Sequence, residues 1–129
     1  MEMSEKYQKA VDFIASFGLD WFRGEAIKYL YIFPYNHGVV DLHKAVEVLT
    51  VLLSDKVSKE YIKTYIGLDY SISTSIDRDF PKEECNQRFK NSFFTMYHLK
   101  KAICNILKGN IKQAIYDIDK LKYIEYDEL

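Results

Sequence analysis

Apolar residues recur along most of the chain with the spacing of one face of an α-helix. From Tyr7 to Phe17 they follow the i, i+3, i+4, i+7 pattern, and Gly18 stands where a helix would end. Asp20 can cap the next helix, and Pro34 ends it. Taken over the whole chain, the pattern predicts about six helices, near residues 5–17, 20–33, 41–53, 54–66 or 58–66, 81–108 and 110–122.

Residues 68–80 interrupt the helical pattern. Ser71–Ile76 alternates polar and apolar side chains as a strand does, but the run is short and has no partner strand, so we expect an irregular loop. Pro81 then gives a helix-start signal, with carboxylates in the following turn. We expect one long helix near 81–108, with an apolar stripe made by Phe89, Phe93, Met96, Ile103 and Leu107.

The predicted fold is therefore all-α, as a bundle in a single domain over residues 1–129. Two predicted helical hairpins, 20–53 and 81–122, also show a faint repeat, because the last helix matches the third in its apolar positions. The alternative is that any two amphipathic helices share this spacing. Both interpretations stay open at the level of sequence.

Composition favours a globular protein whose net charge is too small to produce a strong electrostatic field around it. Hydrophobic residues make up 48% of the 129 positions and charged residues 29%, and the formal net charge is -1. Such a balance does not favour nucleic acid or an anionic membrane as partner. No apolar run approaches the roughly 20 residues of a membrane span, and the polar start does not resemble a signal peptide. We therefore expect a cytoplasmic protein with no membrane partner.

No complete catalytic or metal-binding motif is present in the sequence. A P-loop is excluded, and the three histidines and two cysteines lack metal-ligand spacing. All-α nucleotide pyrophosphatases hold Mg²⁺ through paired carboxylates on one helix face, whereas Glu47 stands alone and Asp117 and Asp119 lie on different faces. We expect no catalytic residue, no metal site and no cofactor. Cys85 and Cys104 should be free, reduced thiols.

Short motifs in the first half of the chain carry a resemblance to a known family. Lys6–Tyr7 and Asp12–Ile14 are followed by Phe22–Leu30, which reads FRGEAIKYL, and by Asp41–Ala45, which reads DLHKA. With these motifs, residues 5–53 resemble a family of small phage helical proteins, some of which are described as nucleotide kinases. The family pattern is His-Tyr, then Phe-x-x-Gly-Asn-Ala-x-Lys-Tyr-x-x-Arg, then a glycine-bearing turn and Asp-Leu-x-Lys-Ala.

The departures from the family pattern fall on polar and charged positions. Lys6 replaces the histidine, Glu25 replaces the asparagine, and the arginine expected near Phe33 is missing. Such groups recognise phosphate and stabilise charge during phosphoryl transfer. The resemblance therefore implies a nucleotide-type ligand that is bound or sequestered without efficient catalysis.

The residues expected to hold this ligand surround the Pro34–Gly38 turn. Two antiparallel helices joined there would bring the ammonium groups of Lys28 and Lys44 to one phosphate. Tyrosine can stack on a base and also donate a hydrogen bond, so we expect residues in and beside the turn to contact the base or sugar. These are Tyr31, Tyr35, Asn36 and His37. The alternative is that both lysines are surface residues of closely packed helices.

Eleven tyrosines also suggest a second class of function. Because aromatic side chains dominate binding energy at protein interfaces, the chain is alternatively an inhibitor or adaptor that binds a host protein and has no small ligand. An A/T-rich coding sequence would enrich tyrosine without any functional cause. Either hypothesis is compatible with a homo-oligomer that buries an apolar stripe.

Overall fold

Seven α-helices form within the residues that the computed structural model describes, which are 3–54 and 64–123. The first stretch contains α1 (Met3–Phe17), α2 (Trp21–Ile32) and α3 (Val39–Leu53). The second stretch contains α4 (Asp69–Asp79), α5 (Lys82–Arg88), α6 (Ser92–Lys108) and α7 (Ile111–Leu121). The predicted all-α class is confirmed.

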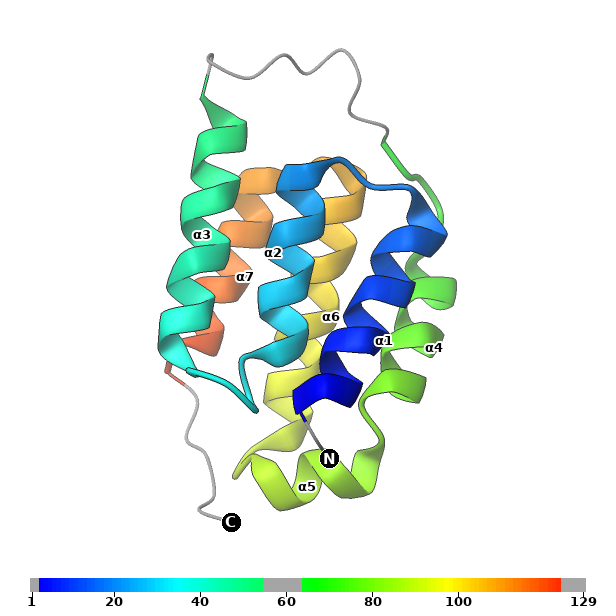
Figure 1. Cartoon of the computed structure of the whole chain (residues 1–129), viewed down its shortest axis with the longest axis vertical. Helices are drawn as coiled ribbons and strands as arrows, with labels where there is room; N and C mark the ends of the chain where they lie inside the picture. Colours follow the sequence, from blue (N-terminus) through cyan, green and yellow to red (C-terminus); the bar gives the residue numbers. More distant parts are fainter. Residues whose placement is uncertain (1–2, 55–63, 124–129) are drawn as a thin grey trace.

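These helices pack as two layers of three (Figure 1). In one layer α2 lies between α1 and α3, and in the other α6 lies between α4 and α7. Across the layers α1 packs on α4, α2 on α6, and α3 on α7, while the short α5 closes the lower end in this view. The hairpins α2–α3 and α6–α7 therefore take corresponding places in the two layers.

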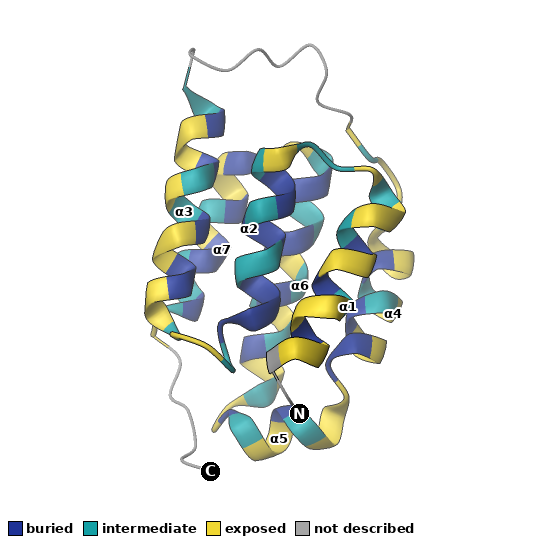
Figure 2. Cartoon of the chain, in the orientation of Figure 1, coloured by how far each residue is buried: buried dark blue, intermediate teal, exposed yellow. Residues whose placement is uncertain are grey.

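The core lies between the layers, where the buried residues of each helix face the helices of the other layer (Figure 2). On α2, for example, Ala26, Ile27 and Leu30 have no exposed surface. Burying one such isoleucine or leucine contributes roughly 1.5–3 kcal/mol. Gly24 allows α1 to approach α2 closely, because a Cβ at this position would lie 3.1 Å from Cγ2 of Ile14.

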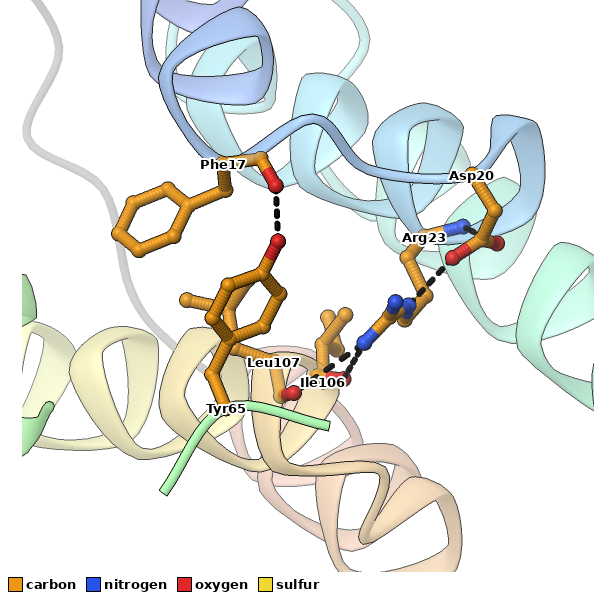
Figure 3. Close-up of polar contacts among 6 residues, drawn as sticks. All are labelled: Phe17, Asp20, Arg23, Tyr65, Ile106 and Leu107. Carbon is orange, nitrogen blue, oxygen red and sulfur yellow. Dashed lines mark hydrogen bonds and ion pairs between the residues drawn. The ribbon is translucent and has the colours of Figure 1, made fainter. Parts of the chain in front are cut away.

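A buried arginine fastens the start of α2 to the end of α6 (Figure 3). Asp20 caps α2 by accepting from the backbone N–H of Arg23 at 3.0 Å, and its carboxylate also pairs with the guanidinium. The same guanidinium donates to the carbonyl of Leu107 at 3.1 Å. Beside it, the hydroxyl of Tyr65 donates to the carbonyl of Phe17. Side chains thus bond the terminal carbonyls of α1 and α6 and a backbone N–H at the start of α2.

The prediction of a loop over residues 68–80 is wrong, because residues 69–79 form α4. Ile72 and Ile76 stand four positions apart and are fully buried against the bundle. Between them Thr74 is exposed, and its hydroxyl donates to the carbonyl of Tyr70 at 2.9 Å. Two buried isoleucines on one helical face therefore outweigh the weak helix propensity of the serines and threonine.

The single long helix predicted near 81–108 is divided into α5 and α6. The backbone of Phe89 is extended, with φ -116° and ψ 136°, and its ring is buried and stacked on Phe33 at a centroid distance of 6.2 Å. Asn91 then starts α6, accepting from the backbone N–H of Phe94 at 3.1 Å. The chain leaves the helix because this turn buries the Phe89 ring and gives α6 its own cap.

The predicted short helix before Gly67 falls mostly outside the described residues. Of the range 54–66, only Ser54 and residues 64–66 are described, and none of these lies in a helix. Gly67 has a φ of +75°.

Candidate functional site

The two lysines predicted to bind phosphate lie near the same aromatic ring. The ammonium of Lys28 lies 4.5 Å from the ring centroid of Tyr29, and that of Lys44 lies 5.8 Å from it. Lys28 also pairs with Glu25, at 2.8 Å between Nζ and Oε2. Burial by itself would lower the pKa of Lys28, but the hydrogen bond and charge of Glu25 outweigh it and raise the pKa. A phosphate here would have to compete with this carboxylate.

Tyr31 lies in the core, away from the other predicted ligand residues. It is fully buried, its hydroxyl donates to Oδ2 of Asp79 at 2.8 Å, and its ring packs against Phe13 and Phe80. Burial, followed by the neighbouring Asp79 carboxylate, raises the pKa of Tyr31 well above its ordinary value. In this arrangement the ring cannot stack on a ligand, so Tyr31 stabilises the bundle.

Asn36 and His37 are exposed residues of the turn, and both bind Asp41 in the first turn of α3. The Asn36 amide donates to Oδ1 of Asp41 at 3.0 Å, and the backbone N–H of His37 donates to Oδ2 at 2.7 Å. Because Asp41 is fully buried, these contacts fix the turn to the start of α3. The Asn36 amide is therefore already engaged in holding the turn.

Tyr35 is half-buried and lies between cations of other helices. The Arg88 guanidinium lies 4.1 Å from its ring centroid, and the Lys6 ammonium lies 5.2 Å from it. Arg88 also donates to the carbonyl of Pro34 at 2.9 Å. The contacts of the six predicted residues therefore separate into four groups. Lys28 and Lys44 share Tyr29, and Asn36 and His37 share Asp41, whereas Tyr31 and Tyr35 each have their own partners.

A pocket of about 530 Å³ opens between the end of α4, α5 and the first half of α6. We call it the α5–α6 pocket. Its lining residues are Asp77, Phe80, Lys82, Cys85, Asn86, Ser92, Phe93, Met96, Tyr97 and Lys100. Ligand pockets usually measure about 300–1,000 Å³ and combine an apolar wall with a few polar groups, so this hollow has the size and composition of a small-molecule site.

Aromatic side chains dominate one side of the pocket. Phe93 is 84% exposed and Tyr97 is 48% exposed, although both belong to a well-formed helix. Phe94, next to Phe93, is 38% exposed. Exposed rings on one helix face can stack on a planar ligand or bind apolar side chains of another protein.

Charged groups stand at the edge of the same pocket. Lys82 is exposed at the start of α5, and Lys100 on α6 pairs with Asp77 at 2.6 Å between Nζ and Oδ1. The pocket therefore offers two ammonium groups and one carboxylate beside its rings. Asn86 and Ser92, joined by a hydrogen bond, add donors and acceptors.

Cys85 lies at the inner wall and is not an activated nucleophile. Its Sγ lies 3.5 Å from Sδ of Met96 and 3.5 Å from the carbonyl oxygen of Phe80. Burial, with the nearby Glu84 carboxylate, raises the pKa of the Cys85 thiol to about 11. At neutral pH the thiol is protonated and serves as an apolar contact between α5 and α6. Neither Cys85 nor Cys104 forms a disulfide.

A second polar cluster lies between α6 and α7. The buried Asp117 accepts from the Asn105 amide at 3.0 Å, and Nδ1 of His98 lies 3.3 Å from its other oxygen. The His98 ring is held edge-on by Phe94 and Tyr97. Among the residues that the structure describes, no group of three or more histidine, cysteine or acidic side chains is placed to hold a metal ion.

Sequence reasoning missed the α5–α6 pocket because it required two helix boundaries that were not predicted. A continuous helix over 81–108 would place Phe93 on the inward stripe with Phe89, but the break at residues 89–91 turns Phe93 outward. The Phe93-Phe94 pair was an available signal, since adjacent residues on a helix point about 100° apart and cannot both point to the centre of one buried face.

Comparison of the chain with protein-family models, with curated proteins and with solved structures finds no match in any of the three. The resemblance of residues 5–53 to phage helical proteins therefore stays a prediction. Within residues 3–54 and 64–123, no helix has both the length and the apolar character needed to cross a membrane.

Proposed function

We propose that this protein binds a nucleotide-type ligand in the α5–α6 pocket without efficient catalysis. The observation that supports the proposal is the combination of Phe93 and Tyr97 with the ammonium groups of Lys82 and Lys100 around one hollow of about 530 Å³. Base stacking on an aromatic ring contributes about 1–3 kcal/mol per base, and the lysines suit a phosphate. Lys100 is paired with Asp77, so a phosphate would have to compete with that carboxylate for it, whereas Lys82 is exposed at the edge of the pocket.

The proposed biological setting follows from the resemblance of residues 5–53. A phage-encoded protein of this kind would act in the cytoplasm of the host cell. There it would supply nucleotides for phage replication or hold back a host signalling nucleotide. The fold supports the binding part of this proposal, because α6 presents its aromatic face beside a pocket instead of burying it.

Isothermal titration against mono-, di- and cyclic nucleotides tests the proposal directly. Phe93→Ala and Lys82→Ala should each weaken binding about fivefold or more, because each removes a pocket contact without entering the core. Lys112→Ala on the exposed face of α7 is the matched control and should bind as wild type. No heat from any nucleotide at high protein concentration would overturn the proposal.

A double variant separates this pocket from the site predicted around the Pro34–Gly38 turn. Lys28→Ala combined with Lys44→Ala removes both ammonium groups near Tyr29 and leaves the α5–α6 pocket unchanged. Retained affinity supports the pocket. Loss of affinity in this variant, with normal binding by Lys82→Ala, would place the ligand between α2 and α3 instead.

A second candidate function is binding to a host protein through the same exposed aromatics. Phe93, Phe94 and Tyr97 form a contiguous exposed group on α6, and large aromatic side chains are the usual anchors of an interface. A complex whose stoichiometry is lost in Phe93→Ala and unaffected by nucleotide would favour this candidate. A homodimer through this face would appear as concentration-dependent sedimentation of the purified protein.

A further inference from the structure

The short helix α5 forms one wall of the pocket and is held to the bundle by few buried side chains. Cys85 is the one buried residue among its seven, all of which are described. Phe80 before it and Phe89 after it are each only 3% exposed, so a buried ring flanks the helix on either side in the sequence. Segments with few buried apolar contacts are those that open locally at the lowest free energy.

Beneath α5 lies a fully buried lysine. Lys6 on α1 has no exposed surface, its ammonium donates to the carbonyl of Asp79, and it lies 4.1 Å from the ring centroid of Phe80. The carboxylate that pairs with it is that of Glu84 on α5, whose Oε1 lies 3.7 Å away, beyond hydrogen-bond distance. A buried cation whose counter-ion is only loosely placed is poorly compensated for its lost hydration.

The polar atoms on the inner side of α5 are also incompletely satisfied. Among buried side-chain nitrogen and oxygen atoms of the described residues, Oε1 of Glu84 and Nε of Arg88 lack a hydrogen-bond partner. The two residues are four positions apart and therefore share one face of α5. Buried polar atoms are almost always bonded, so the closed position of α5 leaves hydrogen bonds unmade at the place where it covers Lys6.

We propose that α5 is a lid over an anion subsite, and that Lys6 binds the phosphate of the ligand when α5 opens. In the closed form the Glu84 carboxylate stands where the anion would bind. On opening, Lys6 would join the α5–α6 pocket from behind Phe80, because the Phe80 ring contacts Lys6 and also lines the pocket. The identity of the ligand rests on the proposed function above, whereas the opening of α5 can be measured without any nucleotide.

Amide hydrogen exchange of residues 82–88 measures this opening. Glu84→Gln removes the counter-ion of Lys6 and should raise exchange of α5 roughly three- to tenfold, while exchange in the core of α6 stays unchanged. Glu83→Gln, an exposed neighbour on the same helix, is the matched control and should exchange as wild type. Equal exchange in all three proteins would overturn the lid.

Inorganic pyrophosphate tests the anion subsite. If it binds Lys6 in the open form, it should raise exchange of residues 82–88 in the wild-type protein, because a ligand shifts the population toward the state it prefers. Lys6→Met, whose folding circular dichroism checks, should show no such rise. Slower or unchanged α5 exchange on adding pyrophosphate to the wild-type protein would overturn the subsite.

The two proposals fail in different ways. Nucleotide binding in the calorimeter without any effect of pyrophosphate on α5 leaves the proposed function standing and removes the subsite. A rise in α5 exchange with pyrophosphate, without heat from any nucleotide, supports the anion subsite and rules out a nucleotide as the ligand.

Discussion

The guanidinium of Arg23 and the carbonyl of Leu107 are 84 positions apart in sequence and 3.1 Å apart in space. Arg23 is only 1% exposed, and its guanidinium also contacts the carbonyl of Ile106 and the Asp20 carboxylate that caps α2. One side chain thus joins the start of α2 to the end of α6, across the two layers of the bundle. This contact lies at the C-terminal end of α6, at the opposite end of the helix from the aromatic residues of the pocket.

Arg23→Ala should destabilise the protein by about 2–4 kcal/mol, because it leaves the Asp20 carboxylate and the Leu107 carbonyl without this partner. Urea unfolding monitored by circular dichroism measures the change. Lys112→Ala is the control, since Lys112 is exposed on α7 and its loss should leave the unfolding midpoint near wild type. Similar midpoints for the two variants would contradict a structural role for Arg23.

Tyr31→Phe tests whether Tyr31 stabilises the core, as its burial indicates. The substitution removes the hydroxyl that donates to the buried Asp79 carboxylate and should cost about 1–3 kcal/mol of unfolding free energy. Tyr116→Phe, at a side chain that is 53% exposed, should cost almost nothing. Unchanged stability of Tyr31→Phe, accompanied by loss of nucleotide affinity, would instead support the prediction that Tyr31 contacts the ligand.

Helix content was predictable from sequence wherever apolar spacing and end signals agreed. Asp20 caps α2 as expected, and Ile27 and Leu30 are buried as their spacing requires. The same spacing places Tyr31 four positions after Ile27, on the inward face, so its burial was predictable from the helical pattern alone. Tyr31 was predicted to contact the ligand because tyrosine can stack on a base, and its position on the buried face of the helix was not considered.

The features that local sequence does not predict depend on contacts distant along the chain. Lys6 and Arg23 are charged and would ordinarily face water, yet both are buried, and each donates to a backbone carbonyl distant along the chain, that of Asp79 for Lys6 and that of Leu107 for Arg23. The pocket likewise requires α4, α5 and α6 to meet. No local pattern around Phe80 or Lys100 encodes that meeting.

The raised pKa of Cys85 predicts a loss of stability in alkali. The folded thiol has a pKa of about 11, against an ordinary value of 9.0, so above pH 9 the unfolded chain releases a proton that the folded protein retains. Stability contributed by the protonated thiol is therefore complete below about pH 9 and is lost as pH rises toward about 11.

Cys85→Ala should accordingly show a shallower fall of unfolding free energy than wild type between about pH 8 and about pH 10.5. The difference between the two proteins isolates Cys85, because Lys6, whose pKa burial lowers, and Tyr31 are present in both. Parallel curves for Cys85→Ala and wild type would contradict the raised pKa.

Phe89 and Phe93 provide the sharpest check of the break between α5 and α6. On one continuous helix, residues four positions apart share a face, and either truncation would cost a similar amount. In the structure Phe89 is 3% exposed and Phe93 is 84% exposed. Phe89→Ala should therefore cost about 3–5 kcal/mol, and Phe93→Ala should stay within about 0.5 kcal/mol of wild type. Chemical denaturation of the two variants side by side decides between these arrangements, since comparable losses would require an unbroken helix with both rings inside.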